Sequence, residues 1–205
     1  MTHHQHIKAG LVVALAAGTF MAGGCGQTAS KSETAARSGE VDYTRFLLRD
    51  GEQPGVRRVE SVVEEDAEAF AQHAGLTKAE LSLMHSAGMG PATYQPTEGP
   101  GSRGVSSVTL FASAQGAARW LAQEQREGYI RRQLPGGGRL RHFVVPGIPG
   151  ARGWTASKDG RIVGNIFWVQ GRCLMILGNE TSGHFDGPVA TGAHAIYKRT
   201  KGRCP

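Results

Sequence analysis

The densest hydrophobic pattern lies near the C-terminus, where three runs of strand-forming residues are separated by short turns. The runs are Trp154–Lys158, Arg161–Gln170 and Arg172–Leu177, and Asp159-Gly160 separates the first two. Asp-Gly between strand-like runs is a strong hairpin signal, because both residues tolerate a positive φ. The pattern therefore predicts an antiparallel three-stranded meander. Its apolar density predicts that at least one strand is buried on both faces.

Upstream of the meander, the apolar spacing changes to that of helices. The segment Thr77-Lys-Ala-Glu80 has the capping-box pattern that opens a helix. Ser113 is placed to cap one long helix over 114–133. Between these helices, the Gly- and Pro-rich residues 88–104 indicate a loop, and residues 105–112 indicate a strand. This arrangement predicts an α+β fold, an antiparallel sheet packed by helices on one face or on both.

The N-terminus has a pattern of another kind. The apolar run Ala9–Met21 follows a start with a single lysine and leads into small residues before Cys25. A bilayer span needs about 20 apolar residues, so this run fits the core of a signal peptide instead. The residues after Cys25 contain almost no large apolar side chain, which is typical of a flexible tether. We expect a signal peptide over 1–24, a lipidated cysteine and tether over 25–41, and a single α+β domain over 42–205.

The residues Ala22-Gly23-Gly24-Cys25 resemble the lipobox of bacterial lipoprotein precursors, although that family usually has a branched residue where this chain has Ala22. The resemblance implies that Cys25 becomes the mature N-terminus and that its sulfur carries a diacylglycerol. Its amino group would be the site of a third acyl chain such as palmitate. More than one acyl chain gives stable anchoring, so the implied location is the outer side of the cell membrane. If the lipobox is not used, the expected product is a secreted protein.

The charge is distributed unevenly along the mature chain. Without residues 1–24, the chain has 22 Lys and Arg against 17 Asp and Glu. Residues 26–80 contain 7 basic and 11 acidic side chains, whereas residues 81–205 contain 15 basic and 6 acidic side chains. A basic half of an exported protein suits anionic lipids or wall polymers, with Arg131, Arg132, Arg139 and Arg141 as candidate contacts. The alternative is a solvated surface that keeps the protein soluble. Nucleic acid is not an expected partner, because no binding motif is present.

No catalytic motif stands out in the sequence. There is no nucleophile elbow, Walker loop or zinc-protease helix. The segment Gly99–Gly104 matches the glycine pattern of dinucleotide sites, but such a site must follow a strand and open a helix, whereas here a strand follows. We therefore expect no cofactor, no metal and no recognisable catalytic residue. The enzyme alternative is an envelope hydrolase with an unrecognised site around His184 and Asp186, and a polar surface turn is the competing interpretation.

The three cysteines lead to a prediction about covalent structure. If lipid occupies Cys25, then Cys173 and Cys204 are left in an oxidising compartment, where thiol pairs become disulfides. A bond between them would hold the end of the C-terminal helix against the sheet. The alternative is two free thiols, with Cys173 buried as a small hydrophobe and Cys204 at the chain end.

A second resemblance rests on three pieces of the chain: FLLRDGEQPGV at 46–56, SVTLFASAQGAARWL at 107–121, and the predicted meander. They resemble small actinobacterial lipoprotein and sensor-type domains that stand outside the membrane, including sensor modules of receptor kinases. The resemblance implies sensing of a ligand or partner and carries over no functional residue. The sequence thus favours a non-catalytic, lipid-anchored binding module for a small ligand, an envelope polymer or a partner protein. A purely structural envelope protein is the remaining alternative.

Overall fold

The computed structural model describes residues 42–59 and 62–204. The predicted signal peptide, Cys25 and the tether lie outside the described residues. In chain order the elements are η1 (Tyr43–Phe46), β1 (Arg57–Arg58), β2 (Val63–Glu65), α1 (Ala67–His73), α2 (Lys78–Ala87), β3 (Met89–Gly99), β4 (Ser102–Phe111), α3 (Ala114–Glu124), α4 (Glu127–Gln133), β5 (Leu140–Val144), β6 (Arg152–Lys158), β7 (Arg161–Gln170), β8 (Cys173–Thr181) and α5 (Asp186–Thr200).

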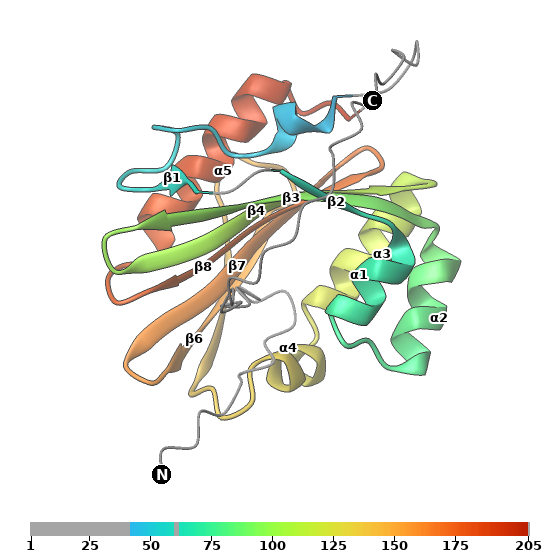
Figure 1. Ribbon diagram of the computed structural model, residues 1–205, viewed down its shortest axis with the longest axis horizontal. Coiled ribbons are helices and arrows are strands. Elements are labelled where there is room, and N and C mark those ends of the chain that lie inside the picture. The colour runs from blue at the N-terminus through green and yellow to red at the C-terminus, as the bar shows by residue number, and fades with distance from the viewer. Residues whose placement is uncertain (1–41, 60–61, 205) are drawn as a thin grey trace, which may run out of the picture.

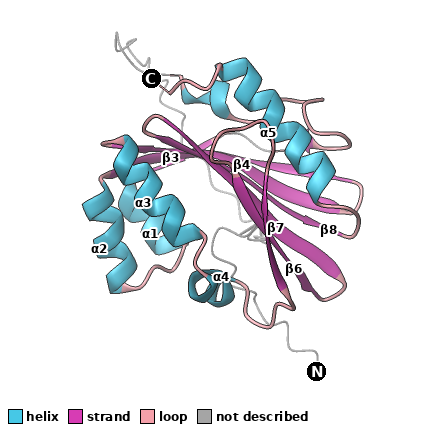
Figure 2. Cartoon of the chain, turned by 180° about the vertical axis from the view of Figure 1, so that it is seen from behind, coloured by secondary structure: helices cyan, strands magenta, loops and turns pink. Residues whose placement is uncertain are grey.

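The strands form one antiparallel sheet in the order β1-β3-β4-β8-β7-β6-β5, with β2 also paired to β3. Helices cover both faces. The helices α1, α2 and α3 lie on one side of the sheet and α5 lies on the other (Figures 1 and 2). The predicted α+β class is confirmed. Among the described residues, no helix has the length and apolar character needed to cross a membrane.

The predicted meander is confirmed as β6, β7 and β8. Asp159 and Gly160 form the first turn with φ values of 50° and 75°, the left-handed region that a tight hairpin requires. Almost every residue of β8 is buried, because it is a central strand between β4 and β7 and is covered on both faces. The long apolar runs of these strands follow from that double coverage.

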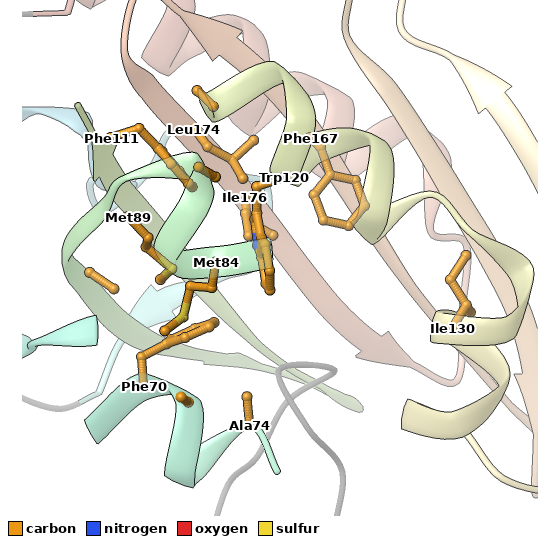
Figure 3. Packing of buried hydrophobic residues seen from close by; sticks show 14 of the residues in the cluster. Phe70, Ala74, Met84, Met89, Phe111, Trp120, Ile130, Phe167, Leu174 and Ile176 are labelled. Atoms are coloured by element: carbon orange, nitrogen blue, oxygen red, sulfur yellow. The ribbon is translucent and has the colours of Figure 1, made fainter. Parts of the chain in front are cut away.

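One hydrophobic core lies between the sheet and α1–α4. Met84, Trp120 and Phe167 are in its centre, each with 1 % or less of its surface exposed (Figure 3). A second core lies on the opposite face, where Trp168 and Met175 of the sheet meet η1 and α5. Removal of apolar surface from water on both faces is the main favourable contribution to folding.

Polar contacts tie α5 to the start of the domain. Arg199 donates to both carboxylate oxygens of Glu52 at 2.8 Å and also to the carbonyl oxygens of Arg45 and Leu47. Both side chains of the ion pair are only 18 % exposed. A planar guanidinium can make this set of contacts and a lysine ammonium cannot. The contacts fix η1 against the last turns of α5.

The expected loop over 88–104 is wrong, because these residues contain all of β3, the turn and the start of β4. Pro96 is tolerated inside β3 because it lies between two short partners: β1 pairs with Thr97 and Glu98, and β2 pairs with residues 92–94. The missing N–H of proline therefore costs no ladder bond with either strand. Pro100-Gly101 forms the hairpin turn, with Gly101 at φ 68°, so the glycine pattern here is a turn between strands.

The single long helix expected over 114–133 is also wrong, because α3 ends at Glu124 and α4 begins at Glu127. The predicted cap at Ser113 is confirmed by its bond from the N–H of Gly116. The break turns α4 back so that Tyr129 lies edge-on to Trp120, with ring centroids 6.4 Å apart. Burial of these two aromatic rings favours the break over a continuous helix.

The structure pairs Cys173 with Cys204, with their Cα atoms 5.7 Å apart and a sequence separation of 31. Cys173 is the first residue of β8 and is fully buried, and Cys204 follows α5. The disulfide therefore closes the C-terminal segment onto the sheet, as the cysteine count predicts.

The capping box at α2 supports a prediction about stability. Thr77 accepts a bond from the N–H of Glu80, and the Glu80 carboxylate accepts from the N–H and hydroxyl of Thr77. Thr77→Ala is expected to lower the free energy of unfolding by about 1 kcal/mol, since helix N–H groups lose a partner. Urea unfolding monitored by circular dichroism measures this. Thr77→Ser keeps the hydroxyl and should cost much less; equal losses in both variants would contradict the capping role.

Candidate functional site

A pocket of about 920 Å³ lies at the edge of the sheet, beside the start of α5. Its walls come from the start of β5, the end of β6, the start of β7 and the first turn of α5. The lining residues are Arg139, Leu140, Arg141, Thr155, Ala156, Ser157, Ile162, His184, Phe185, Asp186, Gly187 and Pro188. This size falls within the range of small-molecule sites, about 300–1,000 Å³.

The loop that enters β5 is held by specific contacts. Gly138 donates to the carbonyl of Ser157 at 2.6 Å, and a Cβ at Gly138 would lie 2.3 Å from the Ser157 hydroxyl, so a larger residue there would require the Ser157 side chain to move. Arg131 of α4 donates to the carbonyl of Gly137 at 2.8 Å and also to that of Gly138. These contacts fix the backbone immediately before Arg139, which leads into the pocket wall.

The opposite wall is anchored by Phe185, which connects β8 to α5. Its side chain is 2 % exposed and lies edge-on to Phe143 of β5, with centroids 6.3 Å apart. Phe185 is the N-cap residue of α5 and makes no side-chain capping bond. The first turn of α5 therefore presents backbone N–H groups without a side-chain cap, at the end of the helix where the dipole favours negative charge.

The charged groups of the pocket are mostly basic. Arg141 donates to both carboxylate oxygens of Asp186, at 2.7 and 2.5 Å, and its guanidinium also lies 5.4 Å from the ring centroid of Phe143. Arg139 and His184 are exposed and have no hydrogen bond or ion pair among the described residues. Since Asp186 compensates Arg141, the uncompensated positive charge of the pocket is that of Arg139.

The pocket brings His184 and Asp186 together but does not arrange them for catalysis. Both oxygens of Asp186 accept from Arg141, and within the described part of the chain no bond joins His184 to Asp186 or to a serine. A hydrolytic triad needs the histidine hydrogen-bonded to a nucleophile and oriented by a third group. In residues 42–59 and 62–204 no cluster of three or more His, Cys, Asp or Glu is placed to hold a metal ion.

The four arginines predicted to contact anionic surfaces do not lie together. Arg139 and Arg141 line the pocket, whereas Arg131 bonds to the loop carbonyls and to Glu127. Arg132 pairs with the buried Glu80 and lies over the ring of Tyr129. Their role toward anions stays a prediction, and for Arg131 and Arg132 the structure supplies intramolecular partners instead.

A buried polar cluster lies behind α4. Glu124 is 4 % exposed and accepts bonds from the Trp120 indole at 3.0 Å and the Tyr129 hydroxyl at 3.4 Å. Burial, assisted by the charge of nearby Glu80, raises the pKa of Glu124 to about 7. Burial alone would raise the pKa of Glu80 as well, but bonds from Thr77 and the charge of Arg132 lower it. The two carboxyl groups thus differ in protonation near neutral pH.

Sequence reasoning missed the apolar walls of the pocket. Ile162 lies in the predicted meander, and nothing in the local sequence around Ile162 or Pro188 marks them as neighbours. They line one pocket because the sheet ends in the order β7-β6-β5 and because α5 begins at the same corner of the sheet. Only the strand order of the sheet brings these residues together, and that order depends on contacts between residues far apart in the sequence.

Comparisons with known proteins do not assign this chain to a family. A scan against protein-family models and a search of curated proteins found no match. Among solved structures, the fold is similar to the extracellular domain of PknH from Mycobacterium tuberculosis. The TM-score is 0.49 at 11 % sequence identity, and the match covers 77 % of this chain and 94 % of that chain.

Proposed function

We propose that this protein is a lipid-anchored module on the outer side of the cell membrane, which binds an anionic ligand in the pocket beside α5. The apolar run before Ala22-Gly-Gly-Cys25 supports export and acylation. The Cys173–Cys204 disulfide independently supports a location outside the cytoplasm, because structural disulfides are rare in reducing compartments. The membrane is then a partner through the acyl chains on Cys25.

The observation that carries ligand binding is the pocket itself, with Arg139 as an uncompensated cation at its rim and apolar walls behind it. Concave sites that combine apolar walls with a few convergent polar groups are the usual form of ligand pockets. The absence of an activated nucleophile among the described lining residues favours binding over hydrolysis. The anion is carried by a small molecule, a lipid or an envelope polymer.

The anchor is tested by Cys25→Ala. This variant removes the acceptor sulfur that the lipobox provides, so the protein should lose its acyl chains while the domain over 42–205 keeps its melting temperature. Detergent phase partitioning of the wild type and the variant measures the result. Equal recovery of both in the detergent phase would contradict lipidation at Cys25 and would make residues 9–21 an uncleaved anchor.

Ligand binding is tested by blocking the pocket at Gly187. A Cβ at Gly187 meets nothing within 4 Å, so Gly187→Tyr can add a ring at the pocket wall without a backbone clash. Gly128→Tyr is a matched control, because Gly128 also lies in the first turn of a helix, is exposed and has open space. The protein is the soluble chain from residue 26 onward, which lacks the lipidated Cys25, and the probes are acetate, phosphate, decanoate and decyl phosphate.

At constant ionic strength at least one probe should raise the melting temperature of the wild type and of Gly128→Tyr, because a ligand that binds the folded state stabilises it. Gly187→Tyr should abolish or strongly reduce the shift. If no probe stabilises the wild type, or if both variants respond equally, the pocket is not an anion-binding site.

A further inference from the structure

We infer that the ligand is an amphiphile with a single anionic head group, a carboxylate or a phosphate, and a hydrocarbon body. This inference rests on the proposed function of the pocket and specifies the chemistry of its ligand. The head group would pair with Arg139, and the hydrocarbon would lie against Ile162 and Pro188.

The head-group end is defined by Arg139. Its guanidinium is exposed and has no intramolecular partner among the described residues, while the backbone before it is fixed by the Arg131 contacts to Gly137 and Gly138. Arginine binds carboxylates and phosphates through paired N–H donors. The neighbouring Arg141–Asp186 pair is an internal example of this chemistry, since one guanidinium there already holds a carboxylate.

The number of available cations limits the charge of the ligand. Asp186 occupies Arg141, which leaves Arg139 as the free permanent cation, with exposed His184 as a further hydrogen-bond donor or acceptor. A polyanion would bring additional charges toward Asp186 with no second free arginine to receive them. A single head group fits this arrangement better than a polyphosphate or a polycarboxylate.

The size and the walls of the pocket require more than a head group. A pocket of about 920 Å³ is far larger than an inorganic anion and matches the sites of drug-sized ligands. Ile162 is a partly buried hydrophobic at the edge of the second core, on the face of the sheet that α5 covers, and the half-buried Pro188 lies in the first turn of α5. Apolar surface of these two residues is available to cover a hydrocarbon chain.

The same chemistry could come from a soluble amphiphile or from a lipid in the membrane, and the experiment separates these sources. Calorimetric titrations at constant ionic strength use the soluble chain from residue 26 and probes kept below micelle-forming concentrations. Decanoate and decyl phosphate carry head and tail, acetate and phosphate carry the head alone, and decanol and decyltrimethylammonium carry the tail without an anion. Cosedimentation with vesicles of phosphatidylglycerol in phosphatidylcholine tests the membrane source.

Decanoate or decyl phosphate should bind at least tenfold more tightly than acetate, phosphate, decanol and the cationic amphiphile. Arg139→Gln should weaken this binding by about tenfold or more, the loss expected for one charge-assisted contact. Arg152→Gln is the matched control, because Arg152 is an exposed arginine at the other end of β6, and it should change binding less than twofold. Vesicle binding that depends on Arg139 assigns the source to membrane lipid; its absence assigns a soluble amphiphile.

Equal binding of decyl phosphate and phosphate would overturn this inference while leaving the proposed anion site intact. Equal binding of decanoate and decanol, or an unchanged affinity in Arg139→Gln, would overturn it as well. If none of the anionic probes binds, the proposed function and the inference both fail.

Discussion

Cys204→Ser is expected to lower the free energy of unfolding by about 3–4 kcal/mol, the loop-closure value for a bond that spans 31 residues. In a domain of this size the melting temperature should fall by on the order of 10 °C. The variant leaves Cys173 as a buried thiol at the start of β8, where it packs as a small hydrophobe. The loss therefore reports the cross-link rather than a new cavity.

Reductant provides the control for this prediction. It should lower the melting temperature of the wild type by a similar amount and leave that of Cys204→Ser unchanged. Mass spectrometry of the exported, non-reduced protein after alkylation checks the bond directly. Alkylation of both Cys173 and Cys204 would show that the pair is reduced. The disulfide would then not contribute to the free energy of unfolding.

Glu124→Gln is expected to remove a pH dependence of stability between about pH 4.5 and pH 7. Burial raises the pKa of the folded-state carboxyl from 4.5 to about 7, so the folded protein holds this proton more tightly than the unfolded chain does. The stabilisation is complete below pH 4.5 and is lost as the pH rises to 7. The loss amounts to about 3 kcal/mol, since one pKa unit corresponds to about 1.4 kcal/mol.

The substitution preserves the contacts of the site. A glutamine Oε1 can accept the bonds that Trp120 and Tyr129 donate to Glu124 Oε1, and its amide carries no charge that must be buried. Urea unfolding at a series of pH values should show a falling stability in the wild type and a flatter profile in Glu124→Gln. Glu64→Gln, at an exposed carboxylate, should keep the wild-type slope. Parallel profiles for all three proteins would contradict a neutral Glu124 in the folded state.

Local signals account for the parts of the fold that the sequence predicted well. The Asp159-Gly160 turn, the apolar runs of the meander and the Thr77 capping box all act within a few residues, and each appears where its pattern indicates. The disulfide followed from counting cysteines in an oxidising compartment rather than from any geometry.

The errors arose where contacts between distant residues decide the outcome. The loop predicted over residues 88–104 includes Pro96, which lies in a strand because β1 and β2 leave that position without a ladder partner. The helix over 114–133 contains no proline at its break, and it ends because Trp120, Glu124 and Tyr129 pack together when α4 turns back. Neither effect is visible in a local window of sequence.

The candidate pocket shows the same limit. Charge alone selected Arg131, Arg132, Arg139 and Arg141 equally, but packing directs the first two to the loop carbonyls and Glu80. Only Arg139 and Arg141 reach the corner where β5 meets the start of α5. That meeting depends on the strand order β8-β7-β6-β5, which joins segments more than forty residues apart.

The most direct test of the proposed function is a map of the ligand contact by nuclear magnetic resonance. The soluble chain from residue 26, which lacks the lipidated Cys25 and is labelled with nitrogen-15, is titrated with decanoate and, separately, with decyl phosphate at constant ionic strength. The backbone amides of Arg139–Arg141, Thr155–Ser157 and His184–Gly187 should shift in a saturable way, and those of α1 and α2 should not. Saturable shifts confined to other parts of the domain, or no saturable shift at all, would contradict a ligand site beside α5.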